Sequence, residues 1–428
     1  MKIAIAIMSL ILLGYVAGLA QGQAGSQPAS SPSSLLIDGM EQISYVSPTE
    51  DAKKVDLSLV GGHDSPGAMR VEIPKNRVYA LAHKQIKPDV QWDYYDGVSF
   101  WVKGDGSANW GNIRLQMGDY TKAFVGSFPL ADTNWHEVRL AWGDFTSFGP
   151  GMGELGPYGQ FKPSQVDLIA FGNSWNFTTK HQTPGVSFDI DDLTLVRGVK
   201  ASRPRVAIEQ FQPLSAVIAK LKAGQKVTVL ALGDSITWGT GVGGNDKSYP
   251  AIVTKMLKEK YPSAQIVYEN RSIGGSCTAK HRQWLRRDIV NVQPDLIVTM
   301  FGYNELPGGN DPNVLQWSGR AYAHNLAWYL EEVAGATNTK PACIVLAPIP
   351  GRDVNWNALD PLAQGVRDFC AANPNITMAE ANAYFKAMGK EEYAKLMGDE
   401  AHPNAKGHQK MAEVVMKAID DADAADAK

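Results

Sequence analysis

The sequence of 428 residues is poor in cysteine and has no large excess of charge of either sign. Its three cysteines, Cys277, Cys343 and Cys370, cannot all pair and match no zinc-binding spacing, so we expect buried free thiols and at most one disulfide. Lys plus Arg number 41 and Asp plus Glu 44, a net charge of −3, which argues against a broad basic surface for nucleic acid. Hydrophobic residues make up 44%, enough for packed cores and too many for a largely disordered chain.

The one long apolar run lies at the start of the chain. It extends from Ile3 to Ala20 after Lys2, and Gly18-Leu19-Ala20 supplies the small residues of a signal-peptidase site. We predict that residues 1–20 are a signal peptide and that the protein is secreted or periplasmic, with no membrane contact after signal removal. A retained membrane anchor is the alternative. Residues 21–34, rich in Ser, Gly, Gln and Pro, are predicted to be a disordered linker.

The pattern of residues 35–198 is typical of an all-β sandwich. Short alternating segments are separated by Gly, Pro, Asn and Asp, and no window has a convincing helical period. The predicted strands include 97–102, 113–117, 135–140, 166–171 and 186–190. We therefore expect a jelly-roll sandwich over residues 35–198.

Residues 226–420 have a different pattern, after a linker over 199–225 that contains a short helix at 213–222. Apolar strands are predicted at 227–232, 265–270, 295–301, 342–347 and 376–380. Helices are predicted between and after them at 250–260, 278–290, 318–334, 360–372 and 404–418. Strict alternation of strand and helix predicts a five-stranded parallel sheet with helices on both faces, an α/β/α domain of flavodoxin-like type. The polar tail 421–428 is expected to fray.

Polar residues follow several of these strands, where the loops of a parallel sheet gather ligands. Ser235 follows the first strand, Gly275 the second and Asn304 the third, while Asp399 and His402 precede the last helix. This set suits acyl transfer, because a serine hydroxyl needs a base to take its proton. His402 is the predicted base and Asp399 is predicted to orient it.

The attacked carbonyl becomes an oxyanion, which needs hydrogen-bond donors placed around it. We expect the backbone N–H groups of Ser235 and Gly275 and the side-chain amide of Asn304 to supply them. Gly274 is an alternative donor to Gly275, and Asn304 could instead form an Asx turn. Ser235 could instead cap a helix.

Two further histidines, His281 and His408, lie in the same predicted domain. His408 is a weaker candidate for the base, since it lies in the last predicted helix without a carboxylate three residues before it. His281 is expected on a helix surface or behind the site.

These segments together resemble the SGNH (GDSL-type) hydrolases. Gly233-Asp234-Ser235-Ile236-Thr237, the glycine after the second strand, Gly302-x-Asn304 and Asp399-x-x-His402 occur in the family's order. The resemblance implies a nucleophilic serine, a histidine base, an orienting aspartate and an oxyanion hole at Ser235, Gly275 and Asn304. One departure is Glu305, where the family usually has Asp, and this departure concerns local loop geometry.

We expect no cofactor and no catalytic metal, because no HExxH or Cys/His cluster is present and the chemistry needs none. The sandwich carries acidic residues near its first and last strands, among them Glu41, Asp191 and Asp192. A structural Ca²⁺ site there is one interpretation. A solvated acidic edge that resists aggregation is the other.

The sandwich resembles the galactose-binding-like jelly rolls of carbohydrate-binding modules, on the segments 95–104 and 186–193. A jelly roll followed by an SGNH domain is similar to carbohydrate esterase family two, although this sandwich is larger. The resemblance implies a serine O-acetylesterase whose partner is an acetylated polysaccharide or oligosaccharide. Trp238, Trp284 and Trp356 are candidate sugar-stacking residues, with burial in the core as the alternative. The alternative functions are a lipase or thioesterase of the same fold, and a glycan-binding protein with an inactive hydrolase domain.

Overall fold

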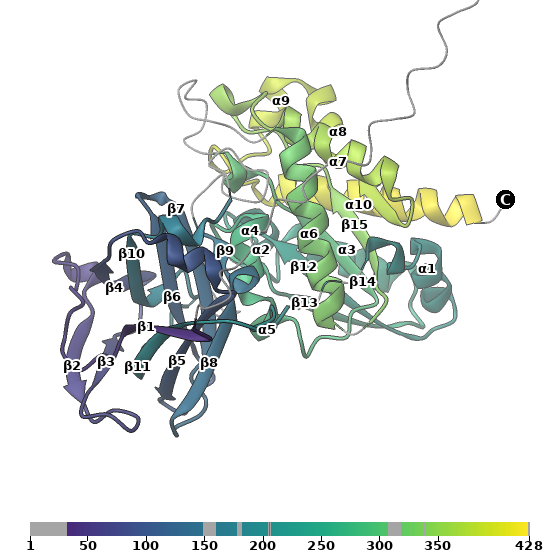
Figure 1. The fold of residues 1–428 in the computed structure, drawn as a ribbon. Coiled ribbons are helices and arrows are strands. Elements are labelled where there is room, and N and C mark those ends of the chain that lie inside the picture. The colour runs from purple at the N-terminus through teal and green to yellow at the C-terminus, as the bar shows by residue number, and fades with distance from the viewer. Residues whose placement is uncertain are drawn as a thin grey trace, which may run out of the picture.

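A computed structural model describes residues 32–148, 160–177, 182–203, 205, 207–306, 318–337 and 339–426. The predicted signal peptide and most of the predicted linker over 21–34 lie outside these residues. Within them, no helix is long and apolar enough to cross a membrane. Two domains lie side by side, an N-terminal β-domain and a C-terminal α/β domain (Figure 1).

The N-terminal domain is the predicted sandwich of two antiparallel sheets. One has the order β2-β3-β11-β5-β8 with β1 also pairing β11, and the other has the order β4-β10-β6-β7-β9. The first sheet comprises β1 (Ser34–Asp38), β2 (Asp56–Val60), β3 (Ala68–Ile73), β5 (Gly97–Gly104), β8 (His136–Ala141) and β11 (Val186–Val196). The second comprises β4 (Tyr79–Gln85), β6 (Trp110–Met117), β7 (Asp119–Pro129), β9 (Thr146–Ser147) and β10 (Leu168–Ser174).

The sandwich core forms between the two sheets because apolar residues alternate along the strands. In β5, Val98, Phe100 and Val102 are fully buried. Phe100 meets Phe128 of β7 and Phe171 of β10 edge to face, with ring centroids 5.2 and 5.5 Å apart. Such aromatic pairs across the layer add to the free energy that burial alone provides.

The C-terminal domain has a five-stranded sheet of order β13-β12-β14-β15-β16, in which all pairs are parallel. Its strands are β12 (Lys226–Gly233), β13 (Gln265–Asn270), β14 (Leu296–Met300), β15 (Ala342–Leu346) and β16 (Ile376–Ala379). The strand prediction is therefore confirmed, to within a few residues at each end. Along the chain, the sheet grows from β12 to β13 on one side and from β14 to β16 on the other. The ends of β12 and β14 therefore lie at the change of strand order, where ligands bind in such sheets.

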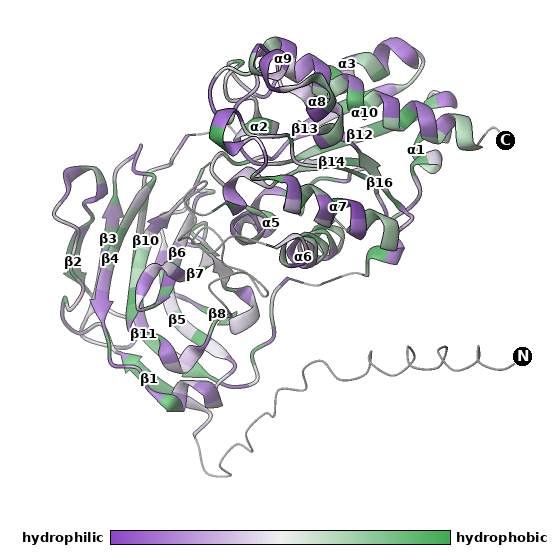
Figure 2. Ribbon diagram, turned by 90° about the horizontal axis from the view of Figure 1, so that it is seen from above, coloured by the Kyte–Doolittle hydropathy of each residue, from purple (hydrophilic) through white to green (hydrophobic). Residues whose placement is uncertain are grey.

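Helices cover both faces of this sheet, as Figure 2 shows. They are α1 (Leu214–Lys222), α2 (Ser235–Trp238), α3 (Tyr249–Lys260), α4 (Thr278–His281), α5 (Leu285–Asp288), α6 (Gly319–Thr337), α7 (Asp360–Ala372), α8 (Ala381–Met388), α9 (Lys390–Ala394) and α10 (Ala405–Asp426). Strand residues alternate between two cores. Val227 and Val229 of β12 pack with α1, α3 and α10, whereas Leu230 and Leu232 pack with α5, α6 and α7.

Two sequence predictions for the helices were wrong. The segment 278–290 is not one helix but α4, a 3₁₀ turn over Arg282–Trp284, and α5. Residues 279–285 of this segment are all buried, so contacts on every side override the single apolar face of an ordinary surface helix. The tail does not fray at 421, because α10 continues to Asp426. The three cysteines are buried and free, as predicted.

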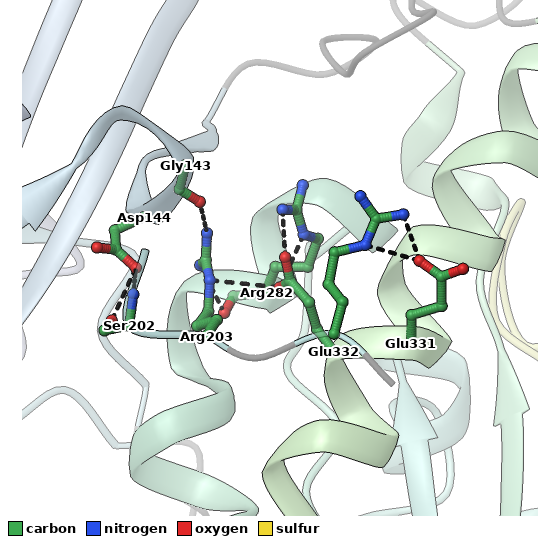
Figure 3. Close-up of polar contacts among 8 residues, drawn as sticks. Gly143, Asp144, Ser202, Arg203, Arg282, Glu331 and Glu332 are labelled. Atoms are coloured by element: carbon green, nitrogen blue, oxygen red, sulfur yellow. Dashed lines mark hydrogen bonds and ion pairs between the residues drawn. The ribbon is translucent and has the colours of Figure 1, made fainter. Parts of the chain in front are cut away.

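A buried arginine joins the two domains (Figure 3). Arg203, in the connection between them, donates to the carbonyl of Gly143 in the sandwich at 2.6 Å and to that of Arg282 in the α/β domain at 3.1 Å. Its Nε lies 3.3 Å from Glu332 of α6, which also forms a buried pair with Arg282 at 2.6 Å. These groups hold α6 and the 3₁₀ turn against the sandwich.

Candidate active site

Ser235 lies at the sharp turn between β12 and α2. Asp234 caps α2, and its carboxylate accepts a hydrogen bond from the N–H of Ile236 at 2.9 Å. Ser235 is the first residue of the helix, so its own N–H has no intrahelical acceptor. The turn requires glycine at 233, where a Cβ atom would lie 2.4 Å from the carbonyl oxygen of Met300. The turn thus presents both the hydroxyl and the N–H of Ser235 at the end of the sheet.

His402 reaches Ser235 from the loop before α10. Its Nε2 lies 2.9 Å from Ser235 Oγ. Its Nδ1 lies 2.8 and 3.0 Å from the two carboxylate oxygens of Asp399. A proton on Nδ1 is then shared with Asp399, which leaves the lone pair of Nε2 facing the serine hydroxyl. The structure therefore brings together the three residues predicted to act as nucleophile, base and orienting carboxylate.

Asp399 is fixed by the backbone of its own tight loop. Its Oδ1 accepts hydrogen bonds from the N–H groups of His402 at 2.7 Å and Ala401 at 2.8 Å. Burial opposes the charge of Asp399, but the hydrogen bonds from His402 and Ala401 outweigh it and lower the pKa of this carboxyl. Asp399 is thus ionised at neutral pH, as an orienting group for an imidazolium must be.

The predicted oxyanion donors lie on the neighbouring loops. Asn304, in the 3₁₀ turn after β14, donates one amide hydrogen to the carbonyl of Ser276 at 3.0 Å, which leaves its second hydrogen for another acceptor. Gly275 has φ +70°, a conformation that L side chains rarely adopt, and its N–H donates to no other described residue. With the N–H of Ser235, these groups are available as the three donors that the sequence predicts.

Two buried carboxyls lie behind the nucleophile. Burial raises the pKa of Asp234 to about 7 and that of Glu305 to about 7, and the charge of Glu305 adds to the effect on Asp234. Glu305 accepts a hydrogen bond from the N–H of Thr278, at the start of α4, at 2.7 Å. Glu305, which stands where the family usually has Asp, therefore links the loop after β14 to the start of α4.

Of the three predicted sugar-stacking tryptophans, two are not available to a ligand. Trp284 is 0% exposed, and the guanidinium of Arg287 lies 4.1 Å from its ring centroid. Trp356 is also buried and packs edge to face on Tyr393. These two predictions were wrong because each ring completes a core. Trp238 is half-buried on α2, and its role in sugar binding stays a prediction.

The other histidines near the site have structural partners. His281 is fully buried, not on a surface, and its ring nitrogens lie 2.8 Å from the carbonyl oxygen of Arg271 and 3.2 Å from the hydroxyl of Tyr329. His408 is also fully buried, and its Nδ1 accepts the N–H of Tyr249 at 3.1 Å. The contact with Ser235 therefore belongs to His402 and not to His408.

The structure does not support the predicted calcium site. Among the described residues, no group of three or more His, Cys, Asp or Glu side chains could hold a metal ion. Asp191 accepts from the N–H of His63 at 2.8 Å and the hydroxyl of Ser65 at 2.7 Å, and its other oxygen accepts from the N–H of Asp192. Its oxygens are thus occupied in fixing a loop, and Asp191, Asp192 and Glu41 do not form a ligand set.

Sequence reasoning missed Trp175, which comes from the sandwich. Its Nε1 donates to the carbonyl of Gly274 at 2.8 Å, across 99 positions in the sequence. A Cβ atom on Gly275 would lie 2.5 Å from Trp175 Cζ2, so the indole occupies the space beside this glycine. The glycine pair signals that something approaches the backbone closely, but no local pattern names a partner in another domain.

Comparison with known families identifies both domains. Residues 231–410 match the GDSL-like lipase/acylhydrolase family, and residues 30–179 match the carbohydrate binding domain of family 11. The chain therefore combines a GDSL-like lipase/acylhydrolase domain with an N-terminal domain of the carbohydrate-binding type, as the sequence motifs predict. No curated protein matches the chain.

Several solved structures are similar to parts of the chain. An acetylxylan esterase from Geobacillus stearothermophilus is 23% identical over 46% of this chain and 96% of its own, with a TM-score of 0.39. A two-domain esterase active on acetylated mannans is 21% identical over 51% and 54%, with a TM-score of 0.36. The lipase/acylhydrolase from Enterococcus faecalis is 16% identical over 45% and 95%, with a TM-score of 0.37. These TM-scores are below 0.5, so the solved structures carry no argument about this chain. The assignment of the two domains rests on the family matches.

Proposed function

We propose that this chain is a secreted serine esterase that removes O-acetyl groups from a polysaccharide or oligosaccharide. The observation that carries the proposal is the contact of 2.9 Å between Ser235 Oγ and His402 Nε2, with Asp399 on the other nitrogen of the ring. A hydroxyl, an imidazole and a carboxylate in this order are the arrangement that makes serine a nucleophile.

In the proposed reaction, His402 Nε2 takes the proton of Ser235 as its oxygen attacks the acetyl carbonyl. The N–H groups of Ser235 and Gly275 and the amide of Asn304 stabilise the negative oxygen of the tetrahedral intermediate. His402 then returns the proton to the departing sugar oxygen, which leaves an acetyl group on Ser235. A water molecule, deprotonated by His402, releases acetate by the same steps.

Two features support the substrate. The N-terminal domain matches a carbohydrate-binding family, which favours a glycan ester over a lipid. The predicted oxyanion loops carry small or polar residues at Gly275, Ser276 and Asn304, which suits a short acyl group better than a fatty acid. Export, as the N-terminal apolar run predicts, would bring the enzyme to polysaccharides outside the cell.

The most direct test of this function is release of acetate from a panel of acetylated polysaccharides such as xylan, mannan and pectin. We expect Ser235→Ala to lower turnover by about three orders of magnitude or more. Ser263→Ala is the matched control, because this exposed serine lies at the opposite end of the sheet, before β13. Release of acetate that is equal in wild type and Ser235→Ala would show that the wrong serine has been assigned.

The alternatives give different results in the same assays. We expect 4-nitrophenyl acetate to be cleaved far faster than 4-nitrophenyl octanoate. The reverse order would favour a lipase or thioesterase. Binding of polysaccharides without Ser235-dependent hydrolysis of any of these esters would favour the glycan-binding protein.

A further inference from the structure

The indole of Trp175 is placed on the peptide unit that carries a predicted oxyanion donor. The carbonyl of Gly274 and the N–H of Gly275 belong to one peptide group, and Trp175 Nε1 donates to this carbonyl at 2.8 Å. The C=O and N–H of a trans peptide point in opposite directions. The N–H of Gly275 is therefore directed away from the tryptophan, and any rotation of the peptide would break the bond to Trp175.

Trp175 is itself held rigidly, at a cost in backbone conformation. Its φ is +58°, which is rare for a bulky residue, and such strain persists only where the surroundings fix it. Its N–H donates to the carbonyl of Val78 at 2.9 Å. On either side, the N–H of Ser174 donates to Asn112, and the amide of Asn176 donates to the carbonyl of Trp110, each at 2.8 Å. The sandwich thus presents the indole in one orientation.

Side chains of the α/β domain also contact the segment around Trp175 and the loop at Gly275. Arg287 of α5 donates to Asn176 and to the carbonyl of Phe177, the two residues after Trp175. Lys280 of α4 donates to the carbonyl of Gly275 at 2.9 Å, and its ammonium group lies 4.5 Å from the ring centroid of Trp175. The carbonyl of Gly274 is therefore held by Trp175 of the sandwich, and the carbonyl of Gly275 is held by Lys280 of the α/β domain.

A hydrogen bond to the carbonyl oxygen of a peptide polarises the whole group and makes its N–H a stronger donor. It also removes the need for the loop to reorganise as charge develops on the substrate, and such preorganisation is the main source of oxyanion stabilisation. The bond from Trp175 has both effects on the Gly275 N–H. Its benefit is expected in the transition state and not in the substrate complex.

We propose that Trp175 is a positioning residue through which the sandwich domain orients and polarises the Gly275 N–H of the oxyanion hole. The inference rests on the proposed function and adds to it. The N-terminal domain would then contribute to turnover, whether or not it also binds glycan.

The test is Trp175→Phe, which keeps an aromatic ring against Gly275 but removes the indole N–H. The matched control is Trp142→Phe, because Trp142 also lies in the sandwich and donates its indole N–H to a backbone carbonyl, that of Tyr95, at 2.8 Å. With 4-nitrophenyl acetate we expect kcat of Trp175→Phe to fall about tenfold with KM within twofold of wild type. The inhibition constant of a boronic acid, whose serine adduct imitates the tetrahedral intermediate, should rise by a similar factor. Trp142→Phe should change neither.

A kcat and a boronate inhibition constant of Trp175→Phe within twofold of wild type would overturn the proposal, as would a change in KM alone. If Trp175→Phe does not fold, benzothienylalanine at position 175 removes the N–H while keeping the ring shape, and the same changes are expected. Absence of Ser235-dependent hydrolysis in the wild type would instead overturn the proposed function.

Discussion

At the scale of single residues, the contact between Asp399 and His402 decides which ring nitrogen holds the proton. Asp399→Asn keeps the shape of the side chain but places an amide beside Nδ1, so the imidazole can adopt the wrong tautomer. We expect kcat to fall by about 10²- to 10⁴-fold. The control is Asp353→Asn, because Asp353 is an exposed aspartate paired with Arg352 at 2.8 Å. Equal activity of the two variants, measured as acetate release at neutral pH, would contradict the role of Asp399.

Glu305 gives a prediction about stability and pH. Burial raises its pKa from 4.5 to about 7 in the folded chain, so between these values the folded state binds more protons than the unfolded state. Its contribution to stability is therefore fully present at low pH and is lost as the pH rises through 7. Glu305→Gln removes this loss, so the melting temperature of the variant relative to wild type should rise from pH 5 to pH 8.

Between pH 5 and pH 8, the free energy of unfolding of Glu305→Gln relative to wild type should rise by about 2 kcal/mol. Glu413→Gln is the control, because Glu413 is partly exposed on α10 and pairs with Lys410 on the surface. A relative melting temperature of Glu305→Gln that does not change with pH would mean that Glu305 is ionised at little cost.

The sequence predicted which candidate catalytic residues lie together but not the positions of several tryptophans, and the reason is physical. Ser235, Asp399 and His402 could be found because the spacing of strands and loops fixes which loops meet. Trp284 and Trp356 could not be separated from surface tryptophans, because burial depends on packing that is remote in sequence. Trp175 was missed for the same reason, since its contact with Gly274 crosses between domains.

At the scale of elements, the loop between β13 and α4 is the most sensitive part of the site. Gly275→Ala would place a methyl group 2.5 Å from Trp175 Cζ2 at φ +70°. The loop must then move, and we expect kcat/KM to fall about 100-fold or more. Gly389→Ala is the control, because Gly389 has φ +80° but nothing within 4 Å of the added atom. A similar small loss in both variants would show that backbone strain, and not the position of the loop, is responsible.

The elements of the α/β domain were easier to predict than those of the sandwich. The central strands β12, β14 and β15 are buried on both faces over most of their length and appear as continuous apolar runs. The edge strands β13 and β16 are partly exposed, but they too were found near their observed limits. In the sandwich, β2, β3, β4 and β7 lacked a clear signal, although the class of fold was correct. The helix predicted over 278–290 is interrupted near Lys280 and Arg282. Lys280 donates to the carbonyl of Gly275, and Arg282 pairs with Glu332 of α6.

At the scale of the whole molecule, Arg203 joins the two domains in a buried site. Arg203→Met leaves the carbonyl of Gly143 without its donor and Glu332 with a single cation, and breaking such a pair typically costs about 3 kcal/mol. Arg205→Met is the control, because Arg205 pairs with Glu331 near the surface, where the expected cost is below about 1 kcal/mol. Calorimetry should show a melting temperature several degrees lower for Arg203→Met only. Equal melting temperatures of the two variants would contradict the structural role of Arg203.

The central claim, that His402 activates Ser235, can be tested by labelling with a fluorophosphonate, which reacts much faster with an activated serine than with an ordinary one. Mass spectrometry of the intact protein should show one label on wild type, and peptide mapping should place it on Ser235. Neither Ser235→Ala nor His402→Ala should be labelled, although the latter keeps the serine. A label on another residue, or labelling of His402→Ala as fast as wild type, would contradict the account.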